Sequence, residues 1–171
     1  MANCLYCKGE IGDDMQFCPL CGKKQVMVYT QTFQRGNMSE DEFIRKINEW
    51  FAAYPTVANV KGRFLLNSQV GMFVNKYRLD AFAIEYEVFD KANENQYALV
   101  SLTESGITKT PSEVLLAKWK VKNPGATVLN TGGGVHQRGQ TGSLMLQSGF
   151  GAVNKTQLYV FFKFNRSKGT A

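Results

Sequence analysis

The chain has 171 residues, of which 44% are hydrophobic and 20% are charged, and its formal net charge is +6. These values are typical of a globular protein with a sizeable core, so they exclude a wholly disordered chain. No apolar run approaches the roughly 18 residues needed to cross a bilayer, and the first residues lack the basic and apolar stretches of a signal peptide. We therefore expect a cytoplasmic protein that does not bind membranes.

All the cysteines lie near the start of the chain, in two C-x2-C pairs formed by Cys4, Cys7, Cys18 and Cys21. Each pair places two thiolates on one tight turn, and two facing turns complete a closed tetrahedral metal site. Reduced thiols in the cytoplasm favour metal binding over disulfides. The spacing therefore predicts a structural zinc ion, with a rubredoxin-like iron centre and a dithiol redox pair as alternatives.

The residues around these cysteines favour a zinc ribbon. A glycine closely follows each pair, Gly9 after the first and Gly22 after the second, as expected where the chain bends through a positive φ. The stretch from Phe17 to Gly22 resembles the short zinc-ribbon module at the N-terminus of many bacterial proteins, although Lys8 stands where that family has glycine. The resemblance covers residues 4–22. It implies a structural cap or a contact with protein or nucleic acid, and no activity.

A polar stretch and then a helix are expected next. Residues 29–38 are mostly polar and are predicted to link a zinc ribbon at residues 1–28 to a domain at residues 39–171. Ser39 is a favourable N-cap followed by acidic residues, and apolar residues recur at helical spacing until Pro55. This pattern predicts an amphipathic helix of about fifteen residues.

Beyond Pro55 the hydrophobic period changes to two, which is typical of strands. A polar turn at residues 91–95 separates two of them, so we expect these two to form an antiparallel hairpin. A second helix is predicted after Thr110, where Pro111 and Glu113 complete a capping box, and it ends near Pro124. No internal repeat is visible. The predicted strands cover residues 57–67, 71–76, 78–90, 96–103, 126–130 and 157–165.

Together these elements predict an α+β fold, with a small N-terminal zinc ribbon followed by an antiparallel or mixed β-sheet and two helices. The most distinctive part of the main domain is the stretch 131–151, which holds seven glycines. Glycines let backbone N–H groups approach an anion, so this stretch is a candidate ligand loop, or else a plain connection. The candidate residues are Gly132, Gly133, Gly134, His136 and Arg138.

Two chemical roles are suggested by the same stretch, a general base and a phosphate-binding loop. His136 is the only histidine and could serve as a general base. A phosphate loop is not expected, because Gln140 occupies the position of the lysine that such a loop requires. No catalytic residue is assigned from the sequence.

The final third of the chain is basic. Residues 111–171 hold eight lysines and arginines against Glu113 alone, a local charge of +7. Such a region suits nucleic acid or an acidic protein surface, and it is also consistent with ordinary solvated faces. Residues 158–166 mix aromatic and basic side chains, as in a nucleic-acid platform or a central strand buried on both faces. The candidate phosphate contacts are Lys118, Lys120, Lys122, Arg138, Lys155 and Lys163.

The leading interpretation is a zinc-binding, non-enzymatic interaction protein, whose ribbon and α+β domain bind a macromolecular partner, with a protein favoured. The first alternative is a nucleic-acid-binding protein that uses the basic C-terminal third. The second is an enzyme with a Gly-rich active-site loop around His136. Structural zinc is the only cofactor expected.

Overall fold

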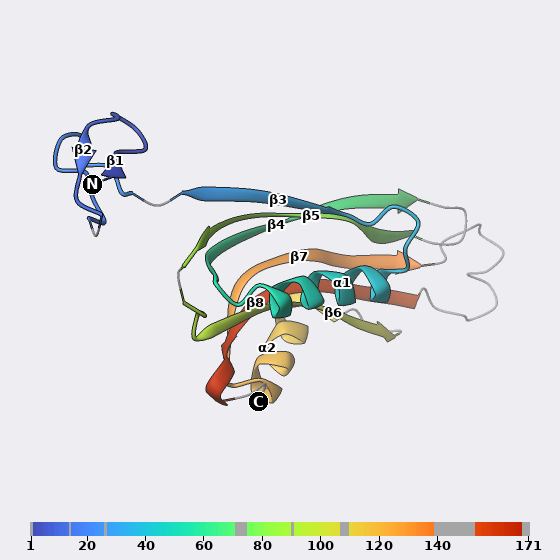
Figure 1. The fold of residues 1–171 in the computed structure, drawn as a ribbon. Helices are drawn as coiled ribbons and strands as arrows, with labels where there is room; N and C mark the ends of the chain where they lie inside the picture. Colours follow the sequence, from blue (N-terminus) through green and yellow to red (C-terminus); the bar gives the residue numbers. More distant parts are fainter. Residues whose placement is uncertain are drawn as a thin grey trace, which may run out of the picture.

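The computed structural model describes residues 2–13, 15–25, 27–70, 75–89, 91–106, 110–138 and 153–168. These residues form two helices and eight strands in three antiparallel sheets, which confirms the predicted α+β class. None of the described helices is long and apolar enough to span a membrane. Figure 1 shows the smallest sheet, with the cysteines, at one end of the molecule and the two larger sheets stacked beside it.

The two larger sheets have three strands each. Sheet I has the order β3-β5-β4, and sheet II has the order β6-β8-β7. Two helices, α1 and α2, complete the main part of the molecule (Figure 1). The element bounds are β3 Val28–Gln34, α1 Glu40–Ala53, β4 Val57–Val70, β5 Asn75–Val88, β6 Asn95–Gly106, α2 Ser112–Lys122, β7 Ala126–Arg138 and β8 Val153–Asn165.

The two sheets repeat one connectivity. In each, a strand is followed by a helix, then a second strand, then a third strand that pairs between the first two. The helix ends also correspond, because Tyr54 N–H bonds to the Trp50 carbonyl in α1 and Asn123 N–H bonds to the Trp119 carbonyl in α2. The sequence shows no internal repeat, but the topology does. The β-α-β-β unit occurs twice with little shared sequence.

An aromatic core lies between the two larger sheets. Phe82 of β5 contacts Phe161 of β8 at a ring distance of 5.1 Å, and both side chains are fully buried. The sheets approach closely where β4 carries Gly62, since a Cβ there would lie 2.8 Å from the Phe161 ring. Asn130 of β7 donates to the Gly62 carbonyl at 2.8 Å and ties the two sheets together at this side.

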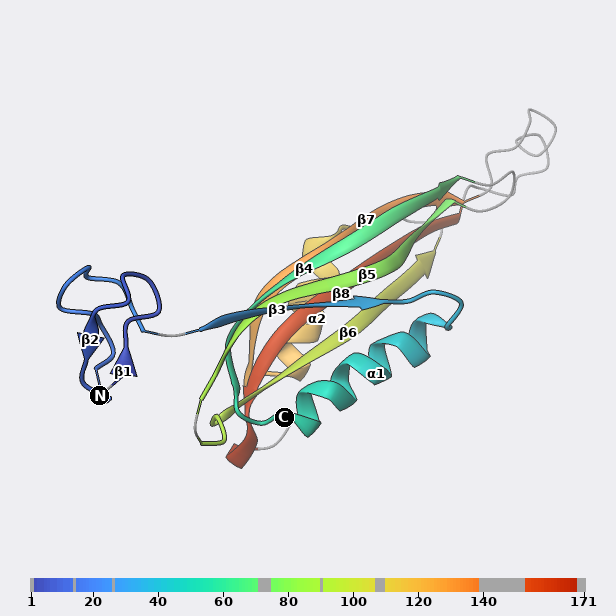
Figure 2. The same cartoon turned by 45° about the horizontal axis from the view of Figure 1, so that its top comes forward.

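Helix α1 lies along the opposite side, next to β6 (Figure 2), and its Trp50 packs on Phe33 of β3 at a ring distance of 5.4 Å. Its apolar face enters the core, where Phe43, Ile47 and Phe51 are buried. Asn48 then pairs with the outer edge of β6: its amide donates to the Leu99 carbonyl at 2.9 Å and accepts from the Leu99 N–H at 2.7 Å. The side chain therefore satisfies the outward N–H and carbonyl groups of Leu99, which the edge position would otherwise leave without a protein partner.

Helix α2 covers the other face of sheet II. Trp119 contacts Phe162 of β8 at 4.9 Å between ring centroids, and the Thr156 hydroxyl donates to the Thr110 carbonyl. Between these contacts, residues 158–161 of β8 are buried in the centre of the sheet. This confirms the interpretation of the final strand as a central strand buried on both faces.

Three local predictions need correction. The strands on either side of residues 91–95 do not form a hairpin, because β5 pairs within sheet I and β6 pairs within sheet II. Residues 29–38, expected to be a linker, contain most of β3, which pairs with β5. The predicted N-cap of the first helix is confirmed, since Ser39 accepts from Glu42 N–H, but α2 begins after Pro111 without a side-chain cap. The hairpin prediction failed because alternation identifies strands without identifying their partners.

Candidate metal centre

The cysteine sulfurs form a compact cluster. Cys4 Sγ lies 3.6 Å from Cys21 Sγ, and Cys7 Sγ lies 3.6 Å from Cys18 Sγ. All four sulfurs lie within 4.8 Å of one another. A tetrahedral zinc or iron ion bound at about 2.3 Å to each sulfur requires sulfurs about 3.8 Å apart. The ligand geometry therefore fits one tetrahedral metal ion held by four thiolates.

Two turns of nearly the same shape carry these sulfurs. In the first, the N–H groups of Tyr6 and Cys7 donate to Cys4 Sγ at 3.4 Å each. In the second, Leu20 N–H donates to Cys18 Sγ at 3.3 Å. Strands β1 (Ala2–Asn3) and β2 (Glu10–Ile11) pair beside the first turn. The repeated N–H···S contacts stabilise negative charge on sulfur, as a thiolate-bound metal requires.

The backbone after each pair takes the same left-handed conformation. Gly22 has a φ of 71°, and the residue at the same position in the first turn, Lys8, has a φ of 61°. The positive φ expected near Gly9 is therefore carried by Lys8. A lysine in this region of the Ramachandran plot costs about 1–2 kcal/mol that glycine does not. The first turn therefore keeps the same shape as the second without a glycine at this position, and the cost is backbone strain at Lys8.

The thiols of Cys4 and Cys7 differ in acidity because their surroundings differ. Desolvation raises the pKa of Cys4, but hydrogen bonds from the Cys7 and Tyr6 N–H groups outweigh it and lower this pKa to about 6. The Gly9 N–H lowers the pKa of Cys7, yet the Cys4 thiol, then desolvation and then the other two thiols raise it to about 11. A divalent cation would supply the charge that lets four thiolates lie together, so metal binding must release protons.

Few other described residues of this module are buried. Cys4, Cys18 and Ile11 form its buried cluster. At the tips of the two turns, Tyr6 is 50% exposed and Leu20 is 68% exposed. A module with so small a core would depend on a bound metal ion for stability. Sequence reasoning missed Ile11, whose place in the cluster follows from the pairing of β1 with β2.

The described part of the expected ligand loop is a strand. Gly132, Gly133 and Gly134 lie in β7, as do the backbones of His136 and Arg138. A Cβ on Gly132 would press on sheet I, and Gly133 has a φ of 112°, so packing and backbone shape account for these glycines. The loop is therefore corrected to a strand over these positions. Residues 139–152 and the side chains of His136 and Arg138 lie outside the described residues, and ligand binding there stays a prediction.

The candidate phosphate contacts lie on different faces of sheet II. Lys163 of β8 is one residue from Phe162, which faces α2, so Lys163 points to the other side of the sheet. Lys118 of α2 is paired with Glu104 at 3.3 Å. Lys120 and Lys122 also lie on α2, and Lys155 shares the strand face of Lys163. The structure therefore does not bring the lysines together.

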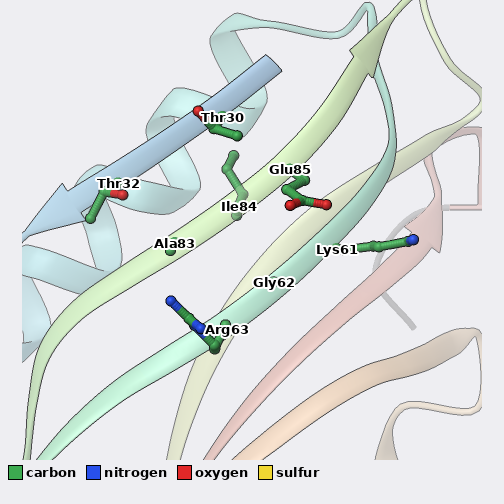
Figure 3. A pocket seen from close by; sticks show the side chains of 8 residues that line it. All are labelled: Thr30, Thr32, Lys61, Gly62, Arg63, Ala83, Ile84 and Glu85. Carbon is green, nitrogen blue, oxygen red and sulfur yellow. The ribbon is translucent and has the colours of Figure 1, made fainter. Parts of the chain in front are cut away.

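A second candidate site is a hollow of about 360 Å³ on the outer face of sheet I. Figure 3 shows the Arg63 side chain extending toward Ala83, while Lys61 extends the other way. Thr30 and Glu85 complete its polar rim. The hollow is open, and its lining mixes these polar side chains with Gly62, Ala83 and Ile84. Sequence reasoning missed it because it depends on the pairing of β3 and β4 with β5.

Comparisons of the chain with family models, with curated proteins and with solved structures found no match. The cysteine cluster is therefore the feature on which a functional assignment can be built.

Proposed function

We propose that this chain is a zinc-binding, non-enzymatic interaction protein, in which the metal-held module presents apolar side chains to a protein partner. The observation that carries this proposal is the exposure of Tyr6 and Leu20 at the tips of the two cysteine turns, at 50% and 68%. Large apolar side chains placed in water on a rigid support are typical of protein-binding surfaces.

The cluster supports a structural role for the ion. Four thiolates fill a tetrahedral coordination sphere, so no position is open for a substrate. The Tyr6 and Leu20 backbone N–H groups donate to cysteine sulfurs, and the same two side chains are exposed. Loss of the ion would therefore disorder the apolar tips together with the turns that hold them.

The charge distribution favours a protein partner over nucleic acid. The lysines of α2 and Lys163 of β8 face opposite sides of sheet II, and Lys118 is neutralised by Glu104. Nucleic-acid surfaces gather cations along one groove, where each phosphate contact adds to the affinity. Dispersed lysines leave the apolar tips as the better candidate for recognition.

A capture experiment with matched variants tests this function. The zinc-loaded full chain is immobilised and exposed to cell extract, beside the variants Leu20→Ser and Val121→Ser. Val121 is 81% exposed on α2, so it controls for the loss of an exposed apolar side chain elsewhere. A true partner is retained by the wild type and by Val121→Ser, and it is lost with Leu20→Ser and after zinc removal. The same protein, once purified, should also bind the zinc-loaded chain in calorimetry.

Two results would count against the proposal. One is a set of captured proteins that is the same for the wild type, both variants and the zinc-free chain. The other is tight binding of labelled DNA or RNA that weakens steeply as salt is raised, which would favour the nucleic-acid alternative.

A further inference from the structure

Strand β3 is an outer strand whose far edge receives no bond from a described side chain, whereas a side chain bonds to one residue on the outer edge of β6 and to one residue of β4. Asn48 of α1 bonds to the Leu99 backbone on the edge of β6, and Asn130 of β7 donates to the Gly62 carbonyl of β4. β3 pairs with β5 on one side only. Among the described residues, no hydrogen bond reaches the backbone groups on its other side.

The repeated β-α-β-β connectivity accounts for this difference between β3 and β6. β3 and β6 are the first strands of the two β-α-β-β units, and α1 of the first unit caps β6 of the second. The corresponding arrangement would place α2 along β3, but α2 lies on the outer face of sheet II against Phe162. One edge is therefore left without the helix that its counterpart has.

The β3 sequence lacks the features that block edge pairing. Residues 28–34 read Val-Tyr-Thr-Gln-Thr-Phe-Gln and contain no charge, no proline and no glycine. Natural edge strands usually carry such residues, lysine and proline above all, to prevent association. Val28 and Tyr29 are 56% and 42% exposed, so apolar surface also lies at the start of this edge.

The direction of the free backbone groups follows from one hydrogen bond. Arg35 N–H donates to the Asp80 carbonyl of β5 at 2.9 Å, so the odd-numbered residues of this strand direct their N–H and C=O groups toward β5. The even-numbered residues direct theirs outward. The free groups therefore belong to Val28, Thr30, Thr32 and Gln34.

The sequence of β3 is close to a palindrome about Gln31, with Thr30 and Thr32 on either side and then Tyr29 and Phe33. We propose that β3 pairs antiparallel with β3 of a second copy of this chain, about a two-fold axis at Gln31, to make one continuous six-stranded sheet from two copies of sheet I. In this register each Thr30 lies opposite a Thr32, and their outward N–H and C=O groups bond reciprocally.

The side chains that this register brings together are favourable pairs. Tyr29 of one copy lies opposite Phe33 of the other, and threonine lies opposite threonine, which are both stabilising cross-strand combinations. Tyr29 already stacks on Tyr86 at 5.6 Å, and Phe33 packs on Trp50 at 5.4 Å. The interface would extend these aromatic rows from one copy into the next and bury the exposed part of Tyr29.

Light scattering after size exclusion tests the proposal on the zinc-loaded full chain. We expect a mass twice the 19.1 kDa of one chain. Thr32→Pro removes an outward N–H in each copy, and edge strands tolerate proline where this group faces solvent. It should give a monomer with an unchanged circular dichroism spectrum, while Thr32→Val, which keeps the N–H, should stay dimeric. A wild-type monomer at every concentration, or a dimeric Thr32→Pro, would overturn the proposal.

Cross-linking provides a test that does not depend on the folding of the proline variant. Across the axis, Gln31 faces Gln31 of the second copy as a non-hydrogen-bonded pair with Cα atoms about 4.5 Å apart, within reach of a disulfide. Gln31→Cys should therefore form a covalent dimer under mild oxidation. Gln34→Cys is the control, because its copies would lie roughly 20 Å apart at about 3.3 Å per residue. Equal cross-linking of both variants, or of neither, would overturn the register.

Discussion

The left-handed residue after each cysteine pair gives the sharpest test of the metal centre. Lys8 and Gly22 occupy matching positions with φ of 61° and 71°. Lys8→Gly removes about 1–2 kcal/mol of strain from the folded turn, while glycine adds about 0.4–1 kcal/mol of entropy to the unfolded chain. The net gain is about 0.5–1 kcal/mol, which corresponds to a roughly two- to fivefold tighter metal affinity.

Gly22→Ala should act in the opposite direction. No atom lies within 4 Å of a Cβ placed on Gly22, so the substitution introduces strain without a clash. The expected loss is again about 0.5–1 kcal/mol, a roughly two- to fivefold weaker affinity. Gly36 has a φ of 56° and equally open surroundings in the turn before α1, so Gly36→Ala should leave the metal affinity unchanged.

Zinc competition with a chromophoric chelator measures all three variants, because folding of so small a module is coupled to metal binding. Weaker zinc binding by Lys8→Gly, or equal effects of Gly22→Ala and Gly36→Ala, would contradict a strained left-handed position after each cysteine pair.

The remaining predictions concern the main domain. Asn48→Ala leaves the Leu99 N–H and carbonyl without their partner, so it should lower the free energy of unfolding in urea by about 2–3 kcal/mol. An unchanged urea midpoint would contradict the role of Asn48 at the edge of β6. Gly62→Ala places a Cβ within 2.9 Å of two core phenylalanine rings and should cost about 1–3 kcal/mol in the same assay, whereas a stabilised variant would refute the close approach of the sheets. Burial and then the Glu40 carboxylate raise the pKa of Tyr159. The neutral phenol therefore contributes stability that is fully present below the ordinary tyrosine pKa of about 10, and this stability is lost as the pH rises toward the higher pKa of the folded protein. Absorbance at alkaline pH should show one tyrosine that ionises only as the protein unfolds, and reversible ionisation of every tyrosine in the folded protein would contradict this.

The sequence predicted best what depends on neighbouring residues. The spacing of Cys4, Cys7, Cys18 and Cys21 indicated the cluster that the structure shows, because each C-x2-C pair fixes two ligands on one local turn. Ser39 and the acidic residues after it marked the start of α1, where the N-cap hydrogen bond is local as well.

Long-range pairing was not predictable in the same way. Nothing local to β5 shows that its partners are β3 and β4 rather than β6, since alternating residues identify a face and not a neighbour. The glycines at 132–134 suggested a loop because their place between two packed sheets appears only when β7 lies against sheet I. Local sequence also failed to predict the backbone of Lys8 within the ribbon. Its left-handed conformation is set by the shape of the turn, whereas lysine itself disfavours that conformation.

X-ray absorption spectroscopy on the purified full chain, with metal content measured on the same sample, tests the metal-held module most directly. The account predicts one zinc ion per chain, surrounded by four sulfur neighbours at about 2.3 Å. A chain without bound metal, with its four cysteines free or joined in disulfides, would contradict it.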